Sequence, residues 1–352
     1  MNVVEAGRWQ PGTTVLAIVL AAPRLLLAQP ASGSGPYFPL DSVWYQDISG
    51  APVDTESANV IQWLSANGGW GTGSMRIDFS IEVLEANAAT PFWTHTPKVT
   101  YYTPDCDVEP VPVPPGGALE GETGYECLAG GDCHLIVVHP PTHRLFELWS
   151  SDLDVVNQEV FSSCLVVWNT SLTYPPSLRG EQCTSADAAG FPIAPLLFSA
   201  DEVAAGSIDH AIRFILPNHR IRGGVYVHPA THAGAPSAPW PAPPYGARLR
   251  LRADFPLNAL PNEGARVVAR AMQRYGILLA DGGSIALTAQ SDRFTAAKWE
   301  GLLGTFDLAA ILVSDFEMIE AGPRIPLTYD CVRIDPIFVD GFELGNTSKW
   351  SR

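Results

Sequence analysis

The chain has 352 residues, of which 16% are charged, 31 are glycine and 31 are proline. This composition favours many short strands joined by turns over a helical bundle, in a chain long enough to bury a sizeable core. The formal net charge of −16 argues against a nucleic-acid-binding surface, which needs clustered Lys and Arg.

The first 31 residues have the features of an export signal. Arg8 supplies a positive charge, the run TTVLAIVLAAPRLLLAQPA is apolar, and Ala28 and Ala31 are small residues suited to cleavage. Two charged residues in this region depart from the ideal pattern, so a membrane anchor or a wrongly assigned start codon is the alternative. We expect cleavage of residues 1–31, no membrane span in the mature chain, and secretion or a place at a bacterial cell surface or periplasm.

The cysteine content fits an exported protein. Because disulfides persist in oxidising compartments, we expect most cysteines to be bridged. The spacing leaves the pairing open, although one pair would close a short, glycine-rich loop between positions 127 and 133. A zinc cluster is the rival interpretation, but the chain has no CxxC pair. The six residues are Cys106, Cys127, Cys133, Cys164, Cys183 and Cys331.

The first part of the mature chain combines one short helix with strands. Ser57 is a candidate N-cap for a helix over 58–66, whose apolar residues share a face. Apolar and polar residues alternate in 75–85, which predicts a half-buried strand, and 97–105 has a similar pattern. Segment 108–126 is rich in proline, which lacks the N–H that a central strand needs, so we expect an extended surface loop.

Strand patterns return in the middle of the chain, over 134–140, 143–152 and 163–169. The tripeptide PPT joins the first two and predicts a hairpin. Segment 207–216 also alternates, with His210 on the apolar face and Arg213 on the other.

The last part of the domain combines a strand with helices. In 247–255, leucines alternate with arginines, which predicts a strand with its leucines inward and its arginines outward. Helical spacing follows over 262–275, with Asn262 as N-cap and Gly276 at the end, and a shorter helix is expected in 295–304. The chain is therefore expected to be mainly β: a β-sandwich or jelly-roll-like domain over 32–335 with a few short helices packed on the sheets.

The C-terminal segment, residues 336–352, is set apart from this domain. Its sequence IFVDGFELGNTSKWS resembles the DGFESG-type tail found at the C-termini of exported gammaproteobacterial proteins. The resemblance implies a sorting or surface-handling tag, and an ordinary flexible terminus is the alternative.

Residues from about 40 to 320 resemble an uncharacterised family of exported bacterial proteins. The motifs that carry the likeness are GGDCH, LFELW, TSADAAGFPI, DEVAAGSIDHAIRF, ARLRLRADF, RYGILLADGGS and SDFE. The resemblance implies a shared fold and a shared site, and it implies no particular reaction. The chain has ANGGWG at 66–71, where the family has a His-Pro-Asp-Phe-Gly run, so no role for that histidine carries over.

The segment CTSADAAGFPIAP contains a single carboxylate, Asp187, between small residues and an apolar wall. Desolvation there would raise its pKa and produce a general acid at neutral pH. The alternative is that Asp187 caps a turn or a short helix through backbone N–H groups. Three further candidate catalytic residues follow within a short stretch: Glu202, His210 and Arg213.

Three other residues are candidates for substrate binding. Glu147 and Trp149 alternate along one strand face, an arrangement typical of sugar-binding clefts because the indole stacks on a pyranose ring. We add His134 to this group, and a solvated strand face is the alternative. The histidine spacings at 134–143 and 228–232 resemble metal-ligand patterns, but neighbouring prolines prevent the helix that such spacing needs, so no metal is expected.

Three functions are compatible with these residues. The first is an exported carbohydrate-active enzyme, a polysaccharide hydrolase or lyase, that acts through acids and a His/Arg pair in a cleft. The others are a non-catalytic extracellular glycan-binding or cell-surface protein and a metal-dependent hydrolase. No nucleotide or dinucleotide motif is present, so no cofactor is expected, and the expected partner is an extracellular polysaccharide.

Overall fold

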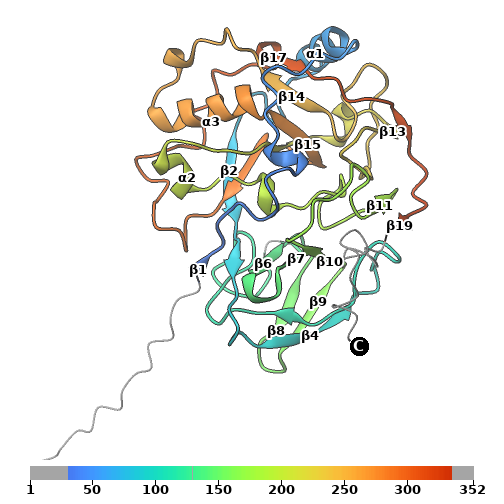
Figure 1. The fold of residues 1–352 in the computed structure, drawn as a ribbon, viewed down its shortest axis with the longest axis vertical. Coiled ribbons are helices and arrows are strands. Elements are labelled where there is room, and N and C mark those ends of the chain that lie inside the picture. Colours follow the sequence, from blue (N-terminus) through green and yellow to red (C-terminus); the bar gives the residue numbers. More distant parts are fainter. Residues whose placement is uncertain (1–30, 129, 335–352) are drawn as a thin grey trace, which may run out of the picture.

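The computed structural model describes residues 31–128 and 130–334, and these form a mainly β structure with three α-helices and several mixed sheets (Figure 1). The expected signal segment, apart from Ala31, and the C-terminal tail motif lie outside the described residues. No helix among the described residues is long and apolar enough to cross a membrane.

A six-stranded mixed sheet forms one half of the molecule, with the strand order β17-β14-β15-β12-β16-β2. The strands β12 and β15 pair in parallel, as do β16 and β2, whereas β14 pairs antiparallel with both of its neighbours. Helix α3 contacts β14 and helix α1 contacts β17, in the upper part of Figure 1. The bounds are β2 Ile77–Ile81, β12 Ile212–Leu216, β14 Arg248–Leu251, β15 Ile277–Gly282, β16 Leu287–Gln290, β17 Phe316–Met318, α1 Ser57–Ala66, α2 Ala200–Ala205 and α3 Glu263–Arg274.

Two further sheets form the other half, in the lower part of Figure 1. Their strand orders are β1-β3-β6-β7-β10 and β5-β4-β9-β8, and both mix parallel with antiparallel pairs. Apolar residues from both sheets form one core cluster, which includes Trp93, Leu135, Phe146 and Val160. The bounds are β1 Ala31–Ser32, β3 Leu84–Glu85, β4 Phe92–Pro97, β5 Val111–Pro112, β6 Leu135–His139, β7 Arg144–Trp149, β8 Asp152–Asp154, β9 Glu159–Ser162 and β10 Cys164–Asn169.

The five-stranded sheet is buried on both faces. All five residues of β6 are buried, and while Leu135 and Val137 belong to the cluster shared with the four-stranded sheet, Ile136 and Val138 belong to the larger core of the molecule. The large core continues from this second face to the six-stranded sheet. Side chains on that face of the five-stranded sheet are therefore placed against segments of the six-stranded half.

The segment 325–333 is held to the body by two short sheets, in which β11 pairs with β19 and β13 pairs with β18. The bounds are β11 Gly180–Glu181, β13 Val225–Tyr226, β18 Ile325–Pro326 and β19 Val332–Arg333. Short 3-10 turns complete the described elements: η1 Val43–Tyr45, η2 Pro140–Thr142, η3 Ala194–Leu196, η4 Asn218–Arg220, η5 Leu257–Ala259 and η6 Val313–Asp315.

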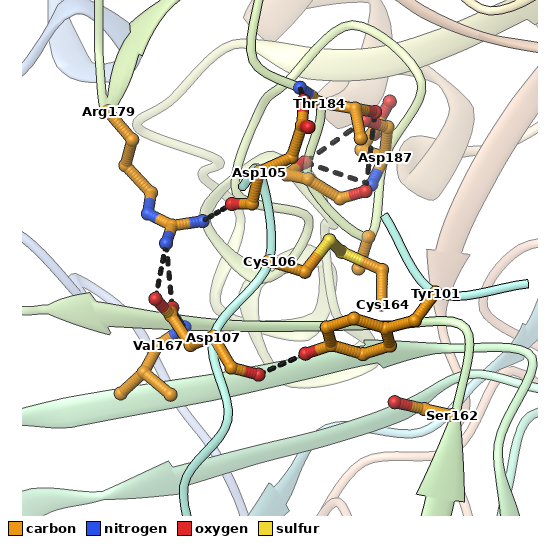
Figure 2. The surroundings of a disulfide bond; sticks show 12 residues. Tyr101, Asp105, Cys106, Asp107, Ser162, Cys164, Val167, Arg179, Thr184 and Asp187 are labelled. Carbon is orange, nitrogen blue, oxygen red and sulfur yellow. Dashed lines mark hydrogen bonds and ion pairs between the residues drawn. A yellow bond between two sulfur atoms is a disulfide. The ribbon is translucent and has the colours of Figure 1, made fainter. Parts of the chain in front are cut away.

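All six cysteines are bridged, which confirms the expectation of disulfides and fits an oxidising, extracytoplasmic compartment. The pairs are Cys106–Cys164, Cys127–Cys133 and Cys183–Cys331. The first pair is surrounded by a polar network in which Arg179 donates to the Asp107 carboxylate at 2.7 and 2.8 Å, and the N–H of Thr184 donates to Asp105 at 2.8 Å (Figure 2).

Several sequence-based expectations are confirmed. The hairpin joined by Pro140–Thr142 is present, and the two strands pair antiparallel. Helix α3 begins where expected, because the side chain of Asn262 accepts the N–H of Ala265 at 2.8 Å. Gly276 follows the helix with a φ of +71°, which a residue with a side chain rarely adopts.

Other expectations about local structure are wrong. No strand covers 97–105 beyond Pro97, and no helix covers 295–304. The segment 108–126 is not a surface loop throughout, because Val111 and Val113 are fully buried and Val111–Pro112 forms the edge strand β5. Ser57 does not cap α1, because its hydroxyl instead accepts the N–H of Met318 at 2.8 Å.

The arginines of β14 are buried instead of solvent-exposed. Arg248 donates to the carbonyls of Val43 and Gln46, and Arg250 donates to carbonyls of the segment 48–51 and to Glu317. The N-terminal segment thus covers the second face of this strand and satisfies the guanidinium groups, which is why both faces are buried. The alternating pattern is present, but the jelly-roll order is not shown by the described strands, among which no sheet closes into a barrel.

Candidate active site

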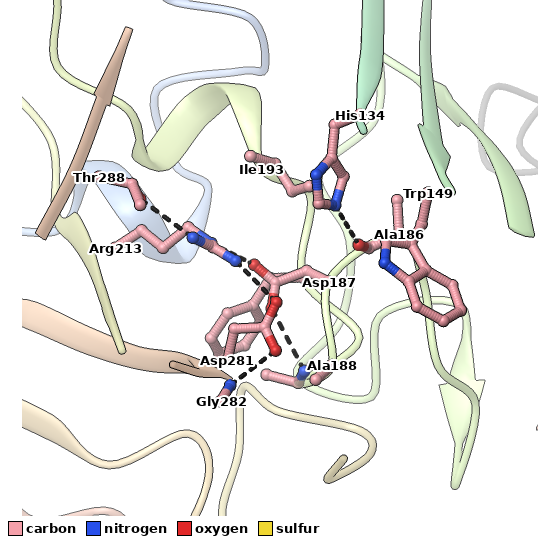
Figure 3. A network of polar contacts seen from close by, with 12 residues as sticks. His134, Trp149, Ala186, Asp187, Ala188, Ile193, Arg213, Asp281, Gly282 and Thr288 are labelled. Carbon is pink, nitrogen blue, oxygen red and sulfur yellow. Dashed lines mark hydrogen bonds and ion pairs between the residues drawn. The ribbon is translucent and has the colours of Figure 1, made fainter. Parts of the chain in front are cut away.

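A buried ion pair joins Asp187 to Arg213, which lies on β12 (Figure 3). The Nε of Arg213 donates to Oδ2 of Asp187 at 2.6 Å, and the two side chains are almost completely buried. The other nitrogens of Arg213 donate to the Thr288 hydroxyl at 3.0 Å and to the Asp281 carboxylate at 2.9 Å. A single guanidinium therefore serves two carboxylates.

The loop that carries Asp187 is shaped by its own polar groups. The hydroxyl of Ser185 accepts the N–H of Asp187 at 2.9 Å and donates to the carbonyl of Phe191 at 2.6 Å. Gly190 has a φ of +81°, and a Cβ there would lie 2.1 Å from the Thr231 hydroxyl oxygen, so only glycine fits. The Asp187 carboxylate accepts one backbone N–H, from Ala189 at 3.3 Å, so Arg213 is its main partner and the capping interpretation is a minor part of its role.

Asp281 on β15 completes this group. Burial raises the pKa of both Asp187 and Asp281, although Arg213 opposes the shift in each case. Two carboxylates that share one cation in a buried setting do not both ionise readily, so the pair retains a proton to higher pH than an ordinary aspartate. Asp281 is the more exposed member, with 27% of its side chain accessible against 0% for Asp187.

A second ion pair lies beside the first. Nδ1 of His134 lies 2.5 Å from the Glu120 carboxylate, and Nε2 donates to the carbonyl of Ala186 at 3.1 Å. Burial opposes protonation of His134, but Glu120 outweighs burial and raises the pKa of the imidazole to about 9. His134 is thus a cation whose two nitrogens are both occupied.

These groups border a cavity of about 440 Å³. Its wall includes Asp281 and His134, and the other polar or aromatic residues that line it are Tyr102, Asp132, Trp149, Thr184, Ser185, His232 and Tyr329. The indole of Trp149 donates to Asp132, and its ring centroid lies 6.1 Å from that of Tyr102. Aromatic rings therefore form part of a hollow that also presents carboxylates, which is a common composition for ligand sites.

His232 differs from His134 in its protonation. Its Nδ1 donates to the carbonyl of Ala188 at 3.0 Å, and burial lowers the pKa of the ring. The imidazole is therefore neutral near pH 7, with its proton on Nδ1 and a lone pair on Nε2. No hydrogen bond found among the described residues involves that Nε2, so it remains an acceptor at the cavity wall.

The expected four-residue catalytic group is divided by the structure. Asp187 and Arg213 lie together behind the cavity, but Glu202 and His210 line a separate cavity of about 320 Å³ with Tyr37 and Tyr45. Glu202 closes a capping box at the start of α2 with Ser199 and bonds to His210 at 3.2 Å. Glu202 is therefore not a free acid, because its oxygens accept N–H and O–H groups within the turn.

The expected substrate-binding residues have different environments. Trp149 and His134 line the larger cavity, whereas Glu147 is completely buried. The Glu147 carboxylate accepts the N–H groups of Ile193 and Ala194, both at 2.8 Å, and the indole N–H of Trp168 at 3.0 Å. Glu147 therefore anchors the loop that carries Asp187 to the five-stranded sheet, and a direct contact with substrate is excluded by its burial.

Sequence reasoning missed Asp132, Asp281, His232 and Tyr329 as site residues. Asp281 was not considered as a site residue, and His232 was considered only as part of the histidine spacing at 228–232. One signal was available: the motifs GGDCH, LFELW, TSADAAGFPI and RYGILLADGGS, which the sequence analysis had singled out, each contribute residues to this cavity.

The histidine patterns do not assemble a metal site among the described residues. Both nitrogens of His134 are occupied as above, and those of His139 contact the Thr142 hydroxyl and the carbonyl of Asn87. The two close groups of potential ligand atoms in the described chain each contain cysteines that are bridged in disulfides.

No family model, curated protein or solved structure was found to match the chain.

Proposed function

We propose that the chain is an exported carbohydrate-active enzyme that hydrolyses a glycan bound in the larger cavity, with Asp281 as proton donor and His232 as proton acceptor. The observation that carries the proposal is the opposite perturbation of two groups on one cavity wall. Burial raises the pKa of Asp281 and lowers the pKa of His232. Two titratable groups whose environments push their pKa values apart are the usual acid and base of a hydrolytic site.

The ion pair of Asp187 and Arg213 behind the cavity helps Asp281 to keep its proton. Arg213 bonds to both Asp187 and Asp281, so one cation is shared by two carboxylates. We assign the proton held by this pair to Asp281, because Asp281 is the member that lines the cavity. Asp187 thus supports the acid without contacting substrate.

The aromatic walls favour a sugar as ligand. Trp149 and Tyr102 lie together on the wall and Tyr329 lies beside His232, with ring centroids 5.3 Å apart. Planar rings stack on the apolar faces of pyranoses, while the adjacent carboxylates accept hydrogen bonds from sugar hydroxyls.

A hydrolase is favoured over a polysaccharide lyase. A lyase acting on a uronate needs a cation to neutralise the substrate carboxylate, and Arg213, the arginine of the expected His/Arg pair, would have to supply it. Arg213 is buried and already bonded to Asp187, Asp281 and Thr288. The residues found to line the cavity include no Lys or Arg.

One observation favours a non-catalytic glycan-binding protein as the second candidate. Both oxygens of Asp281 already accept hydrogen bonds, from the N–H of Gly282 at 2.6 Å and from Arg213 at 2.9 Å. A carboxylate fully engaged in this way could serve to hold the 281–282 turn at the cavity wall while the aromatic rings bind sugar.

The two candidates are separated by assaying a polysaccharide panel for new reducing ends and for binding. Asp281→Asn should lower hydrolysis by about 10²–10⁴-fold, the usual contribution of a general acid, while binding is retained. Asp254→Asn is the matched control, because this aspartate lies on the surface with 82% of its side chain exposed. Full activity of Asp281→Asn would overturn the assignment of the acid. Binding that is lost in Trp149→Ala, without hydrolysis by the wild type, would identify a glycan-binding protein.

A further inference from the structure

We infer that the cavity selects a sugar bearing a positively charged amino group over neutral and anionic sugars. This inference rests on the proposed function, because it assigns a ligand class to the same cavity. The amino group would lie in this cavity against Asp132 and the adjacent rings of Trp149 and Tyr102, with the acceptor groups of the wall facing the same space.

The cavity and the groups behind it carry more negative than positive charge. Among the residues that the structure describes, two carboxylates line the wall and two more lie behind it, whereas two cations accompany them. Both cations already form hydrogen bonds with other groups of the protein, so neither can neutralise an anionic ligand. Even with one proton shared by the aspartate pair, negative charge is in excess and favours a cation. The carboxylates are Asp132, Asp281, Asp187 and Glu120, and the cations are Arg213 and His134.

His232 provides a hydrogen-bond acceptor in the cavity that does not depend on the acids. His232 is buried, with 9% of the residue exposed, and its neutral ring lines the cavity with Nε2 as a hydrogen-bond acceptor. An ammonium group offers three N–H donors and no acceptor, whereas a carboxylate or sulfate offers only acceptors. A wall of acceptor groups therefore matches an amine and repels an acidic sugar.

Two aromatic rings of the cavity lie beside one of its carboxylates. The indole N–H of Trp149 donates to Asp132, so the ring and the carboxylate are held beside each other. Asp132 is exposed and remains able to receive further hydrogen bonds, and the Tyr102 ring lies next to the indole. A cation beside a carboxylate and over an aromatic face gains from both, as in the recognition of amine ligands by other proteins.

The test is equilibrium binding by isothermal titration calorimetry with three β-linked disaccharides. These are the glucosamine disaccharide, its di-N-acetyl form and a galacturonate disaccharide. We expect the amine form to bind about tenfold more tightly than the acetylated form, and the galacturonate form to bind most weakly. The preference should disappear in Asp132→Asn, which keeps an acceptor for the Trp149 N–H.

Asp254→Asn controls for the net charge of −16, because it removes one negative charge at an exposed position. The inference is overturned if the acetylated disaccharide binds as tightly as the amine form. It is also overturned if Asp254→Asn reduces the preference as much as Asp132→Asn, because the effect would then be bulk attraction. Equal binding of neutral and amine sugars leaves the proposed glycan hydrolase intact, whereas both proposals are defeated if none of the three disaccharides binds and the polysaccharide panel shows neither hydrolysis nor binding.

Discussion

The Nε of Arg213 lies 2.6 Å from Oδ2 of Asp187, in the interior between strand β12 and the loop that follows Cys183. This contact explains why a lone carboxylate stands in an apolar segment: its partner is supplied by a strand of the six-stranded sheet. Because Arg213 also reaches Asp281, the buried pair is connected to the cavity wall.

Replacing Arg213 by Met should destabilise the protein strongly. The change leaves Asp187 and Asp281 buried without their counter-charge, which typically costs about 3–5 kcal/mol. The loss should grow as the pH rises, because the two acids can only be accommodated by protonation. Urea unfolding at several pH values measures this. Arg252→Met is the matched control, since Arg252 is 47% exposed, and a change there above about 1 kcal/mol would contradict the argument.

The stability of the protein should decrease between about pH 4.5 and pH 7 because of Glu147. Burial raises the pKa of this carboxyl from 4.5 to about 7, against the opposing effect of three N–H donors. The folded state therefore binds the proton more tightly than the unfolded state, and stability falls with rising pH over this interval, by at most about 1.4 kcal/mol per pH unit. Glu147→Gln keeps an acceptor for Ile193 and Ala194 and should reduce the slope. Identical slopes in the two proteins would show that Glu147 titrates normally.

Glu202→Ala should affect stability and spare hydrolysis. The substitution removes one half of the capping box at α2 and should cost about 0.5–2 kcal/mol. Glu202 lines the smaller cavity, apart from Asp281 and His232. Thermal unfolding and the reducing-end assay test this together. A large loss of activity at unchanged stability would place the chemistry at Glu202 and His210 instead.

Removing the Cys183–Cys331 bond by a double Ala substitution should cost about 2–4 kcal/mol of unfolding free energy. The cysteines are 148 residues apart, and the bond fixes the segment that carries Tyr329 at the cavity wall. The matched control is removal of Cys127–Cys133, which spans only 6 residues and should have a smaller effect. Guanidinium unfolding without reductant measures both, and an equal or greater loss in the control would count against a role of loop length.

The elements that depend on near neighbours were predictable from the sequence. Asn262 and Gly276 delimit α3, and Pro140–Thr142 joins two alternating strands, because caps, turns and side-chain periodicity act over a few residues. The bridging of the cysteines followed from the export signal, since it depends on the compartment, but their pairing required the fold.

The candidate site could be predicted from the sequence only in part. Asp187, Arg213, His134 and Trp149 were identified because their residue types stand out in their local segments, and all four lie at or behind one cavity. The grouping with Glu202 and His210 assumed that closeness in sequence means closeness in space. His210 and Arg213 lie an odd number of residues apart, and this already indicates opposite faces of a strand.

Segments that are distant in the sequence decide what covers each face of a strand. The alternation of apolar and polar residues along the strand carries no information about this. The leucines and arginines of β14 alternate as a half-exposed strand would, yet the N-terminal segment 43–51 buries the arginines and satisfies them. Likewise, Asp281 meets Arg213 because β15 pairs with β12, and the carbonyl of Ala188 holds the proton of the neutral His232 ring on Nδ1 across a loop contact. These contacts join residues far apart in the chain, so their free energy depends on the order of the strands and the packing of the core, which only the tertiary structure determines.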